Sequence, residues 1–334
     1  WSSDVCSSDL GDVFDNQKRK IDYLRVSVTD KCNLRCVYCM PPEGVSPMCH
    51  EDVLSYEEIV RICRLAGDLG IRKYKITGGE PLVRRDCDRL IAMLKALPQT
   101  QSVTVTTNGQ LLAGQLPKLL AAGTDGINIS LDTLDPGLYA RITRGGSLEQ
   151  VMEGLKAAAD SGIRTKINCV SLRGLNDTEL IKMAGLARRF PVDVRFIELM
   201  PLGNGTDYEG MRGEEVLEAL KTAYGEEQPV EGVRGNGPAV YCRFPDFRGN
   251  IGFIDAISHR FCDRCNRVRL TCDGMLKPCL SYEGGYDLRA LLRNCADDEK
   301  IRGIMEEAIA QKPKAHCFQD EGGKETRSMA QIGG

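Results

Sequence analysis

The sequence contains no run of about 20 apolar residues, so no segment has the length and character of a membrane-spanning helix. It has no excess of basic charge either: 44 Lys and Arg stand against 47 Asp and Glu, which gives a formal net charge of −3. An overall field that recruits nucleic acid or an anionic membrane is therefore absent. No basic stretch followed by an apolar core opens the chain. We expect no secretory signal and a cytoplasmic protein.

Tryptophan and histidine are scarce, with one and three residues. The single Trp lies in the first ten residues, WSSDVCSSDL, which are rich in Ser and Asp. These residues share no periodicity with the sequence that follows. We expect residues 1–10 to be a non-native or disordered leader and leave them out of the fold prediction.

Cysteine, in contrast, is abundant, with 15 residues. The odd total and the lack of a secretory signal argue against a disulfide scaffold. Six cysteines fall into two close groups. We expect the other nine to be reduced structural thiols, many of them packed as small hydrophobic side chains: Cys6, Cys49, Cys63, Cys87, Cys169, Cys242, Cys272, Cys295 and Cys317.

From residue 23 to residue 199 the sequence alternates between strand-like and helix-like patterns. Ser55 followed by Glu58, for example, is a capping box at the start of an amphipathic segment. Six such repeats predict a parallel sheet, because a parallel return needs a crossover helix. The predicted strands are 23–29, 73–77, 102–107, 126–131, 164–170 and 193–199, and the predicted helices are 55–69, 85–97, 116–122, 147–161 and 177–190.

Polar residues and glycines gather where these strands end, and ligands bind at that edge of an α/β barrel or sheet. Beyond about residue 212 the alternation stops. Short strand patterns near 240–244 and 250–257 follow, with helix patterns near 214–224, 286–294 and 297–311. We therefore expect an α/β domain over residues 11–212 and a small C-terminal α+β annex over residues 213–334.

Cys32, Cys36 and Cys39 form a C-x3-C-x2-C motif just after the first predicted strand. Three close thiolates can hold three corners of a 4Fe-4S cluster and leave the fourth iron open, which suits catalysis. Zinc is the alternative, but structural zinc needs four ligands, and His50 is the only nearby candidate for the fourth. The spacing favours the cluster.

This motif, with Tyr38 just before its last cysteine, resembles the radical S-adenosylmethionine superfamily. The sequence Gly78-Gly79-Glu80-Pro81 at the end of the second predicted strand resembles the same superfamily. Two glycines allow the backbone to approach a ligand closely. The resemblance implies that S-adenosylmethionine chelates the open iron and is cleaved to a 5′-deoxyadenosyl radical, a reaction that belongs to the cofactors.

A second group, Cys262, Cys265 and Cys279, forms a C-x2-C-x13-C motif. The C-x2-C pair is also a common zinc half-site, which Cys272 or His259 could complete. On the cysteines alone, both a second cluster and a zinc site stay open.

Arg267 and Arg269 follow the pair directly, and on an extended segment two such residues lie on one face. Their planar donor groups suit phosphate. With both cysteine motifs and the terminal Gly333 and Gly334, the sequence over residues 17–334 resembles the GTP 3′,8-cyclase family of molybdenum cofactor biosynthesis.

The resemblance implies an incomplete (βα)6 TIM-like barrel, with a second 4Fe-4S cluster across its cavity that binds the guanine of GTP. Lys75 replaces an Arg of some family members, which keeps the charge but weakens a bidentate clamp. By resemblance, the residues around S-adenosylmethionine are Tyr38, Gly79, Ser130 and Met200; those around GTP are Arg25, Lys75, Thr106, Lys166, Arg267, Val268 and Arg269; and those with catalytic roles are Arg267, Arg269, Gly333 and Gly334.

The implied reaction removes the hydrogen from ribose C3′ of GTP and joins C3′ to C8 of guanine. It demands no histidine base, which agrees with the scarcity of His. The resemblance further implies a low-potential electron donor such as a flavodoxin-like reductase, and a downstream cyclic pyranopterin monophosphate synthase. We expect no nucleic-acid or membrane partner, and a monomer or homodimer.

Two alternatives stay open. One is another radical S-adenosylmethionine enzyme with an auxiliary cluster, such as a peptide maturase, although such enzymes tend to carry more C-terminal cysteines. The other is a non-enzymatic protein with two metal sites. The sequence also leaves open whether Arg144 and Arg173, in loops near the strand ends, contact substrate or are surface charges.

Overall fold

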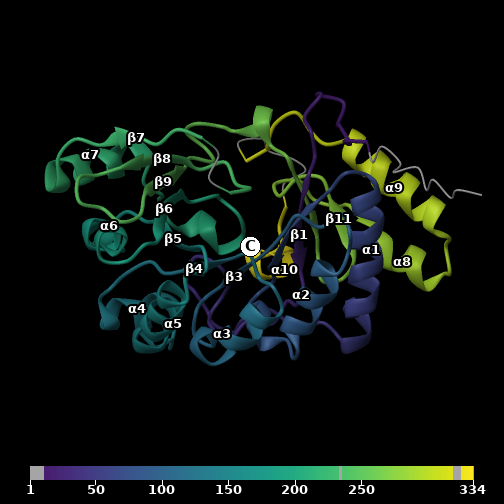
Figure 1. The fold of residues 1–334 in the computed structure, drawn as a ribbon, viewed down its shortest axis with the longest axis horizontal. Coiled ribbons are helices and arrows are strands. Elements are labelled where there is room, and N and C mark those ends of the chain that lie inside the picture. The colour runs from purple at the N-terminus through teal and green to yellow at the C-terminus, as the bar shows by residue number, and fades with distance from the viewer. Residues whose placement is uncertain (1–10, 233–234, 319–324, 334) are drawn as a thin grey trace, which may run out of the picture.

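The computed structural model describes residues 11–232, 235–318 and 325–333. Its first two hundred residues contain the predicted alternation of strands and helices, arranged around a central sheet (Figure 1). The strands pair in parallel in sequence order, which confirms the predicted repeats. They are β1 (Tyr23–Ser27), β2 (Lys73–Thr77), β3 (Ser102–Thr107), β4 (Gly126–Ser130), β5 (Thr165–Ser171) and β6 (Asp193–Glu198).

The helices between these strands follow local signals in the sequence. The Ser55 side chain accepts a hydrogen bond from Glu58 N, and the Glu58 carboxylate accepts one from Ser55 N, so the predicted capping box is confirmed. An additional helix, α4, starts at Pro136 because the Asp135 carboxylate caps it, and our prediction missed it. The helices are α1 (Tyr56–Asp68), α2 (Cys87–Lys95), α3 (Leu112–Ala121), α4 (Pro136–Thr143), α5 (Leu148–Asp160), α6 (Leu180–Arg189) and α7 (Gly213–Tyr224).

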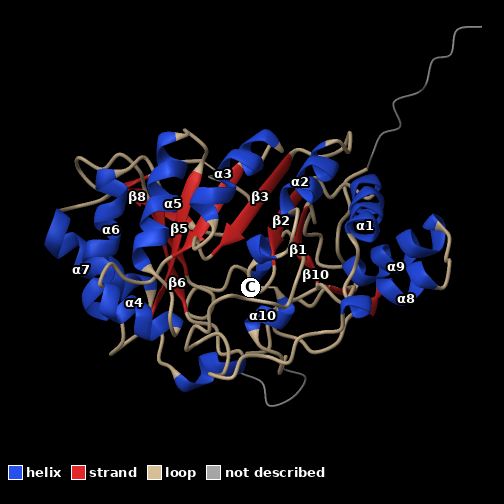
Figure 2. Ribbon diagram, turned by 90° about the horizontal axis from the view of Figure 1, so that it is seen from below, coloured by secondary structure: helices blue, strands red, loops and turns tan. Residues whose placement is uncertain are grey.

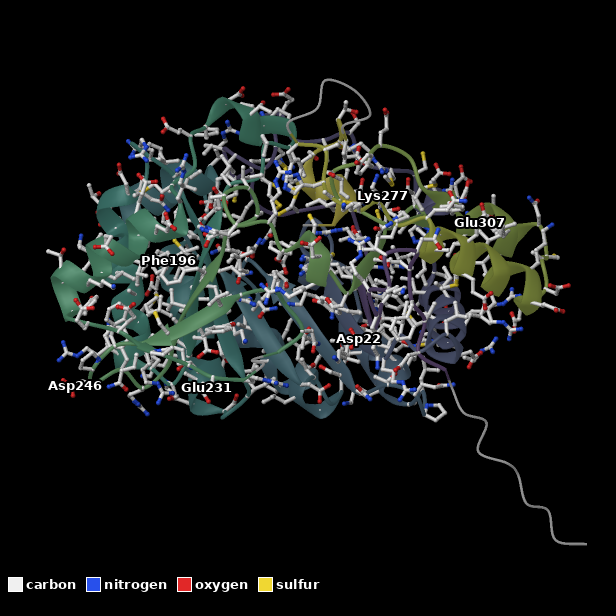
Figure 3. All side chains as sticks on the ribbon, turned by 90° about the horizontal axis from the view of Figure 1, so that it is seen from above. Asp22, Phe196, Glu231, Asp246, Lys277 and Glu307 are labelled. Carbon is white, nitrogen blue, oxygen red and sulfur yellow. The ribbon has the colours of Figure 1, made fainter. Side chains whose placement is uncertain are left out.

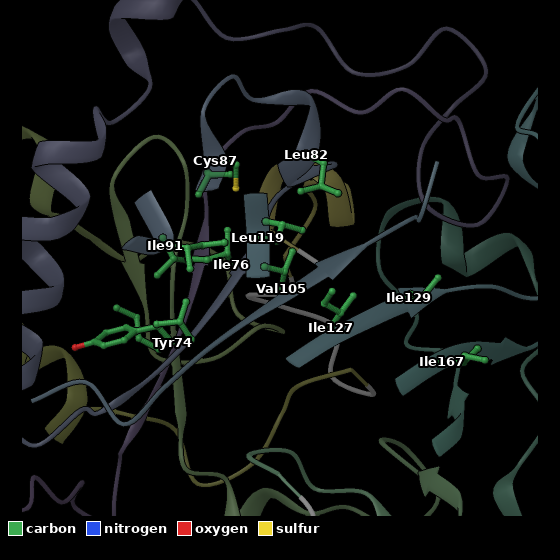
Figure 4. Close-up of a cluster of buried hydrophobic side chains, with 14 of the residues drawn as sticks. Tyr74, Ile76, Leu82, Cys87, Ile91, Val105, Leu119, Ile127, Ile129 and Ile167 are labelled. Atoms are coloured by element: carbon green, nitrogen blue, oxygen red, sulfur yellow. The ribbon is translucent and has the colours of Figure 1, made fainter. Parts of the chain in front are cut away.

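The main hydrophobic core lies between the sheet and these helices. Strand residues such as Ile76, Val105 and Ile127 are fully buried and pack against Ile91 and Leu119 of the helices (Figure 4). Both faces of a barrel-like parallel sheet are covered, so its strands need apolar side chains toward the helical layer. The opposite faces of the same strands are thereby free to carry polar side chains toward the interior of the barrel.

The C-terminal part of the chain, for which we expected a small α+β annex, adds strands to both ends of the same sheet. Strand β10 pairs in parallel with β1, and strand β9 pairs in parallel with β6. The sheet has the order β12-β11-β10-β1-β2-β3-β4-β5-β6-β9-β8-β7. The added strands are β7 (Gln228–Pro229), β8 (Val240–Arg243), β9 (Ile251–Ile254), β10 (Arg267–Leu270), β11 (Met275–Lys277) and β12 (Tyr286–Asp287).

Three helices complete the fold: α8 (Leu288–Arg293), α9 (Asp298–Ala310) and α10 (Met329–Ile332). Helix α10 lies near the centre of the molecule, beside strand β1, in both views (Figures 1 and 2). The last described residues therefore return to the interior of the partial barrel. Residues 1–10, which we expected to be a leader, and Gly334 lie outside the described residues.

Two further predictions concern the chain as a whole. No helix in the described ranges combines the length and apolar character that crossing a membrane requires. The described cysteines are all free thiols. Among those we expected to be structural, Cys49 and Cys295 are exposed, whereas the other described ones are buried: Cys63, Cys87, Cys169, Cys242, Cys272 and Cys317.

Candidate active site

The first cysteine group lies in the loop after β1, as predicted. Cys32, Cys36 and Cys39 are each partly exposed. Burial, followed by the charge of Cys32, raises the pKa of Cys39 to about 12. Burial followed by the charges of Cys39, Asp132 and Cys32 raises the pKa of Cys36 in the same way. Thiols that oppose one another's ionisation become thiolates together only beside a cationic group, and the iron of a 4Fe-4S cluster is such a group.

The Gly78-Gly79 pair packs against the backbone that leads into this loop. A Cβ on Gly79 would lie 2.5 Å from the carbonyl oxygen of Lys31, and one on Gly78 would lie 2.6 Å from that of Thr29. The expected place of Gly79 beside S-adenosylmethionine stays a prediction. The described residues show that both glycines leave room for the neighbouring main chain of the cluster loop. Because these glycines have no side chains, the main chain that leads to Cys32 can pack closely against them.

Glu80 ties the ends of two strands together. Its carboxylate accepts hydrogen bonds from Thr107 Oγ1 at 2.7 Å, Asn108 N at 2.6 Å and Leu82 N at 3.0 Å. Burial nevertheless raises the pKa of Glu80 to about 7. Asn108 in turn donates to Cys32 Sγ at 3.8 Å, so Glu80 also supports the cluster loop.

The residues expected around S-adenosylmethionine lie at the same edge of the sheet. The hydroxyl of Tyr38 donates to Asp132 Oδ2 at 2.6 Å, so its side chain is already engaged in the described structure. Burial raises the pKa of Asp132 to about 6. Ser130 ends β4, and Met200 follows β6 and lines the large central pocket.

The structure distinguishes the roles of two arginines that the sequence left open. Arg144 donates to the carbonyl oxygens of Met40 at 2.9 Å and Arg35 at 3.2 Å, so it braces the cluster loop. Arg173 forms surface ion pairs with acidic residues, at 2.8 Å and 2.6 Å. Arg144 is therefore a structural support and Arg173 a surface charge.

The second cysteine group lines the large central pocket. Cys262 and Cys265 lie in a short turn before β10, and Cys279 follows β11. Burial raises the pKa of Cys265, but the charges of Lys312 and Arg267 outweigh burial and lower that pKa below its ordinary value. This site is thus prepared for a thiolate.

Neither candidate fourth zinc ligand joins this group. His259 faces Glu214 at 3.4 Å, and Cys272 contacts Met48 Sδ at 3.8 Å. Zinc in a structural site has four ligands around one ion. In the described ranges, no three Cys, His, Asp or Glu side chains converge closely enough to hold a single metal ion. Three thiols without a fourth ligand among the described residues are the donor set expected for a cluster with one open iron.

Cations from three adjacent strands line the same pocket. In the register of the sheet, Arg269 of β10 is opposite Arg25 of β1, and Arg25 is opposite Lys75 of β2. Burial, followed by repulsion from neighbouring arginines, lowers the pKa of Arg269 and of Lys75 well below their ordinary values. Like charges directly opposite each other destabilise a sheet. A polyanionic ligand would therefore stabilise this buried row of cations.

Two of the residues expected around GTP, Lys166 and Val268, are not part of this row of cations. Lys166 lines a smaller neighbouring pocket with Lys75, and its Nζ contacts Tyr241 Oη at 2.8 Å and Asp193 at 3.6 Å. The side chain of Val268 is buried in the hydrophobic core, because it alternates with Arg267 and Arg269 along β10. Val268 is not among the residues that line the central pocket, so its expected contact with GTP stays a prediction. Thr106 and both arginines line the pocket, as expected.

The sequence prediction missed Arg195, on β6. It lines the central pocket, and its Nη2 donates to Asn128 Oδ1 at 2.9 Å and Asn168 Oδ1 at 2.5 Å. Its Nε is buried with no partner in the described structure. A sequence signal for Arg195 was available, because an Arg in a buried parallel strand needs a ligand or an ion pair. Arg195 belongs to no motif, however, so the search for motifs did not find it.

The C-terminal tail reaches the site, as predicted. Arg269 Nη1 donates to the carbonyl oxygen of Gly333 at 2.7 Å, and Ala330 N donates to the Cys39 thiol. Gly333 has φ of 86° and a Cβ there would lie 2.6 Å from Ser27 Cβ, so only glycine fits without strain. Ile332 packs with Leu202, Leu280 and Phe318 in a small apolar cluster.

Buried charges anchor this tail. Lys277 lies beside the C-terminal segment (Figure 3), and its Nζ contacts Glu325 Oε2 at 2.5 Å. Both side chains are fully buried. The same Nζ donates to the carbonyl oxygens of Tyr282 and Gly284, at 2.6 Å and 2.8 Å. The tail is thereby held to the sheet just before α10.

Comparison with known proteins places the chain in a family. Residues 26–187 match the radical SAM superfamily and residues 192–318 match Molybdenum Cofactor Synthesis C. The chain is 45% identical over 325 residues to the GTP 3′,8-cyclase of Pelotomaculum thermopropionicum, covering 96% of this chain and 99% of that protein. It is 43% identical over 326 residues to that of Desulforamulus reducens, covering 96% and 100%.

Among solved structures, SuiB of Streptococcus suis bound to S-adenosylmethionine superposes with a TM-score of 0.64 at 16% identity. The match covers 93% of this chain and 77% of that chain, and it supports the fold alone. The partial-barrel fold class is thus confirmed. From its sequence relatives, the chain belongs to the GTP 3′,8-cyclase family of the radical SAM superfamily.

Proposed function

We propose that this chain converts GTP into (8S)-3′,8-cyclo-7,8-dihydroguanosine 5′-triphosphate, the first step of molybdenum cofactor biosynthesis. One observation carries the proposal: the buried row Arg269, Arg25 and Lys75 opens into the same pocket as the second cysteine group. A triphosphate relieves the repulsion among these cations. The cations suit the polyanionic end of such a ligand. The second cysteine group suits a base whose atoms can donate to a metal.

The row of cations orients the substrate. Charges in a water-poor cavity interact far more strongly than on a surface. Arg267 adds its guanidinium from the same face of β10, and its buried Nε has no partner in the described residues. We assign Arg25, Lys75, Arg267 and Arg269 to the triphosphate, with Thr106 beside the sugar and Lys166 at the rim toward the smaller pocket.

The first cysteine group and the loop around it hold the radical-generating cofactors. A 4Fe-4S cluster and S-adenosylmethionine bound there would supply the radical chemistry that hydrogen abstraction from the substrate requires. Cys32, Cys36 and Cys39 are the proposed ligands, and Gly79, Ser130, Met200 and the backbone of Tyr38 surround the methionine and adenosine. Glu80 and Arg144 keep this loop in place.

The second cysteine group faces the base of the nucleotide. We infer that Cys262, Cys265 and Cys279 hold a second 4Fe-4S cluster with an open iron for guanine. The tail then closes the cavity between the two groups, because Gly333 contacts Arg269 and Ala330 contacts Cys39. Its apolar contacts exclude water from the site of radical chemistry. Gly334, which we also expected to act here, lies outside the described residues.

The partners follow from the chemistry. Radical generation consumes one electron of low potential, so we propose an external reductase, flavodoxin-like or similar. The product is proposed to pass to a cyclic pyranopterin monophosphate synthase. A monomer or a homodimer is equally compatible with this site, since every residue assigned here belongs to one chain.

The experiment is product analysis after anaerobic reconstitution with GTP, S-adenosylmethionine and dithionite. We expect about eight irons per chain, 5′-deoxyadenosine formed only with GTP, and the cyclised nucleotide in equal amount. Cleavage of S-adenosylmethionine that leaves GTP unchanged would contradict the proposal and favour a peptide-modifying enzyme. Binding of zinc alone would favour a non-enzymatic metal protein.

A further inference from the structure

One short segment after α9 contacts two cysteines of the second group directly and the third through Ser281. This segment, residues 312–317, leaves the helix, passes beneath the turn Cys262–Arg264 and ends beside Ser281. It contains no predicted ligand and no motif. Its donors nevertheless point to the sulfur atoms or to the main chain that carries them.

Lys312 is the first of these donors. It is buried, and its Nζ donates to the carbonyl oxygens of Arg267 at 2.8 Å and Pro278 at 2.5 Å. It also hydrogen-bonds the thiol of Cys265. None of the ion pairs among the described residues includes a carboxylate for Lys312. A buried ammonium without a carboxylate needs another anion, and Cys265 as a thiolate is in position to be one.

The other end of the segment contacts the other two cysteines, Cys262 directly and Cys279 through Ser281. The backbone N–H of His316 donates to the Cys262 thiol. Cys317 N donates to Ser281 Oγ at 3.1 Å, and Ser281 Oγ lies 3.4 Å from Cys279 Sγ. A thiolate ligand can only accept, so the Ser281 hydroxyl donates to Cys279 once that cysteine binds iron.

The segment is itself fixed from the start of the chain. Arg19 is buried and donates to the carbonyl oxygens of Cys262 at 2.8 Å, Pro313 at 2.7 Å and Lys314 at 3.1 Å. Its Nε lies 2.6 Å from the carboxylate of Asp15, which is also buried. Arg19 thus joins the segment to the cysteine turn, so that the donors on the segment keep their positions.

We propose that residues 312–317, with Ser281, form a hydrogen-bonding shell that raises the reduction potential of the second cluster, with Lys312 as its main positioning residue. This inference rests on the proposed cluster at Cys262, Cys265 and Cys279. Three thiolates give a 4Fe-4S cluster net negative charge, and reduction adds one more electron from the external donor. A buried cation and donors to sulfur stabilise the more negative state.

The test is a redox titration of the reconstituted full-length protein, with dithionite and mediators, followed by electron paramagnetic resonance. The signal that changes when GTP is added identifies the second cluster, and the first cluster serves as internal reference. Lys312→Met removes the charge and the donors, Lys312→Gln removes only the charge, and Ser281→Ala removes the hydroxyl. Lys314→Met is the matched control, because Lys314 is exposed two residues away.

We expect Lys312→Met to shift the reduction equilibrium of the second cluster at least tenfold toward the oxidised form, which is about 59 mV for one electron. Lys312→Gln and Ser281→Ala should shift it less in the same direction. Lys314→Met should match the unmodified chain, and the first cluster should not respond in any variant.

The outcomes separate this inference from the proposed function. If the unmodified chain binds only about four irons, the second cluster itself is wrong, and the shell with it. If about eight irons bind and both Lys312→Gln and Ser281→Ala keep the original midpoint, the cluster stands and the shell is overturned. Should Lys312→Met lose its second cluster, Lys312→Gln and Ser281→Ala decide the question by the same measurement.

Discussion

Arg269 donates a hydrogen bond to the main-chain carbonyl oxygen of Gly333 at 2.7 Å, inside the partial barrel. The contact joins the proposed triphosphate site to the end of the chain. Since Arg269 has five N–H donors in a planar group, one is used for the tail and others remain for an anion. Substrate binding and tail placement are therefore expected to support each other.

The first prediction concerns the arginine pair. Arg267→Ala combined with Arg269→Ala should lower kcat/KM for GTP by about 100-fold or more, because each hydrogen bond from a charged group contributes about 1.5–3 kcal/mol. Iron content should stay unchanged, as neither residue is a ligand. Steady-state assays with iron analysis measure both. Arg173→Ala is the control, since Arg173 pairs only with surface residues, and unchanged GTP turnover in the double variant would remove the triphosphate assignment.

The second prediction concerns the anchor of the tail. Glu325→Gln leaves the buried Lys277 ammonium without its counter-charge, which typically destabilises by about 3–5 kcal/mol. We expect a lower free energy of unfolding, faster tryptic cleavage near Arg327 and reduced turnover. Glu57→Gln is the control, because its pair with Arg89 is more than half exposed and such pairs contribute about 0–1 kcal/mol. Equal stability of the two variants would contradict the anchor.

The third prediction concerns Gly79. Gly79→Ala places a Cβ 2.5 Å from the Lys31 carbonyl oxygen, so the cluster loop must move. We expect loss of the first cluster alone, with iron falling from about eight to about four per chain. Gly114→Ala is the control, since no atom lies within 4 Å of its added Cβ and Ala favours a helix. Full iron content in Gly79→Ala would show that the loop adapts.

The fourth prediction is a pH dependence. Burial raises the pKa of Glu80 to about 7 from an ordinary value of 4.5, so between these pH values the folded chain binds more protons than the unfolded chain. The stability contribution of Glu80 is then fully present below pH 4.5 and is lost as the pH rises through 7. The loss amounts to about 3 kcal/mol.

Glu80→Gln should abolish this slope in the free energy of unfolding. It should also add a pH-independent penalty, because an amide accepts on only one oxygen while Asn108 N and Leu82 N both donate here. Denaturant titrations of both chains across pH 5–8 measure the difference. A variant with the same slope as the unmodified chain would show that Glu80 does not titrate in this range.

The fifth prediction concerns Arg195. Arg195→Gln should raise KM for GTP about tenfold, because a charge that lines the pocket is lost. Cluster content should not change. Arg188→Gln is the control, since Arg188 is an exposed residue of α6. An unaltered KM would place Arg195 in a purely structural role with Asn128 and Asn168.

The sequence was informative wherever a pattern is local. Strands β2 and β3 match the predicted ranges, because alternation within five or six residues identifies them. Helix α10 was missed, since four residues carry no periodicity. The short strands β10 to β12 were not among the predicted strands, because they form by pairing with neighbours distant from the main repeats: β10 with β1, β11 with β10, and β12 with β11.

The sequence by itself determined both cysteine motifs and the shared face of Arg267 and Arg269, because ligand spacing and alternation are properties of neighbouring residues. Only the tertiary structure decided that Arg269, Arg25 and Lys75 stand in register, since strand pairing joins segments far apart in the chain. It also decided the placement of Lys312 and Arg195. Those side chains acquire their environment from burial between distant elements, and no local pattern around either residue indicates it.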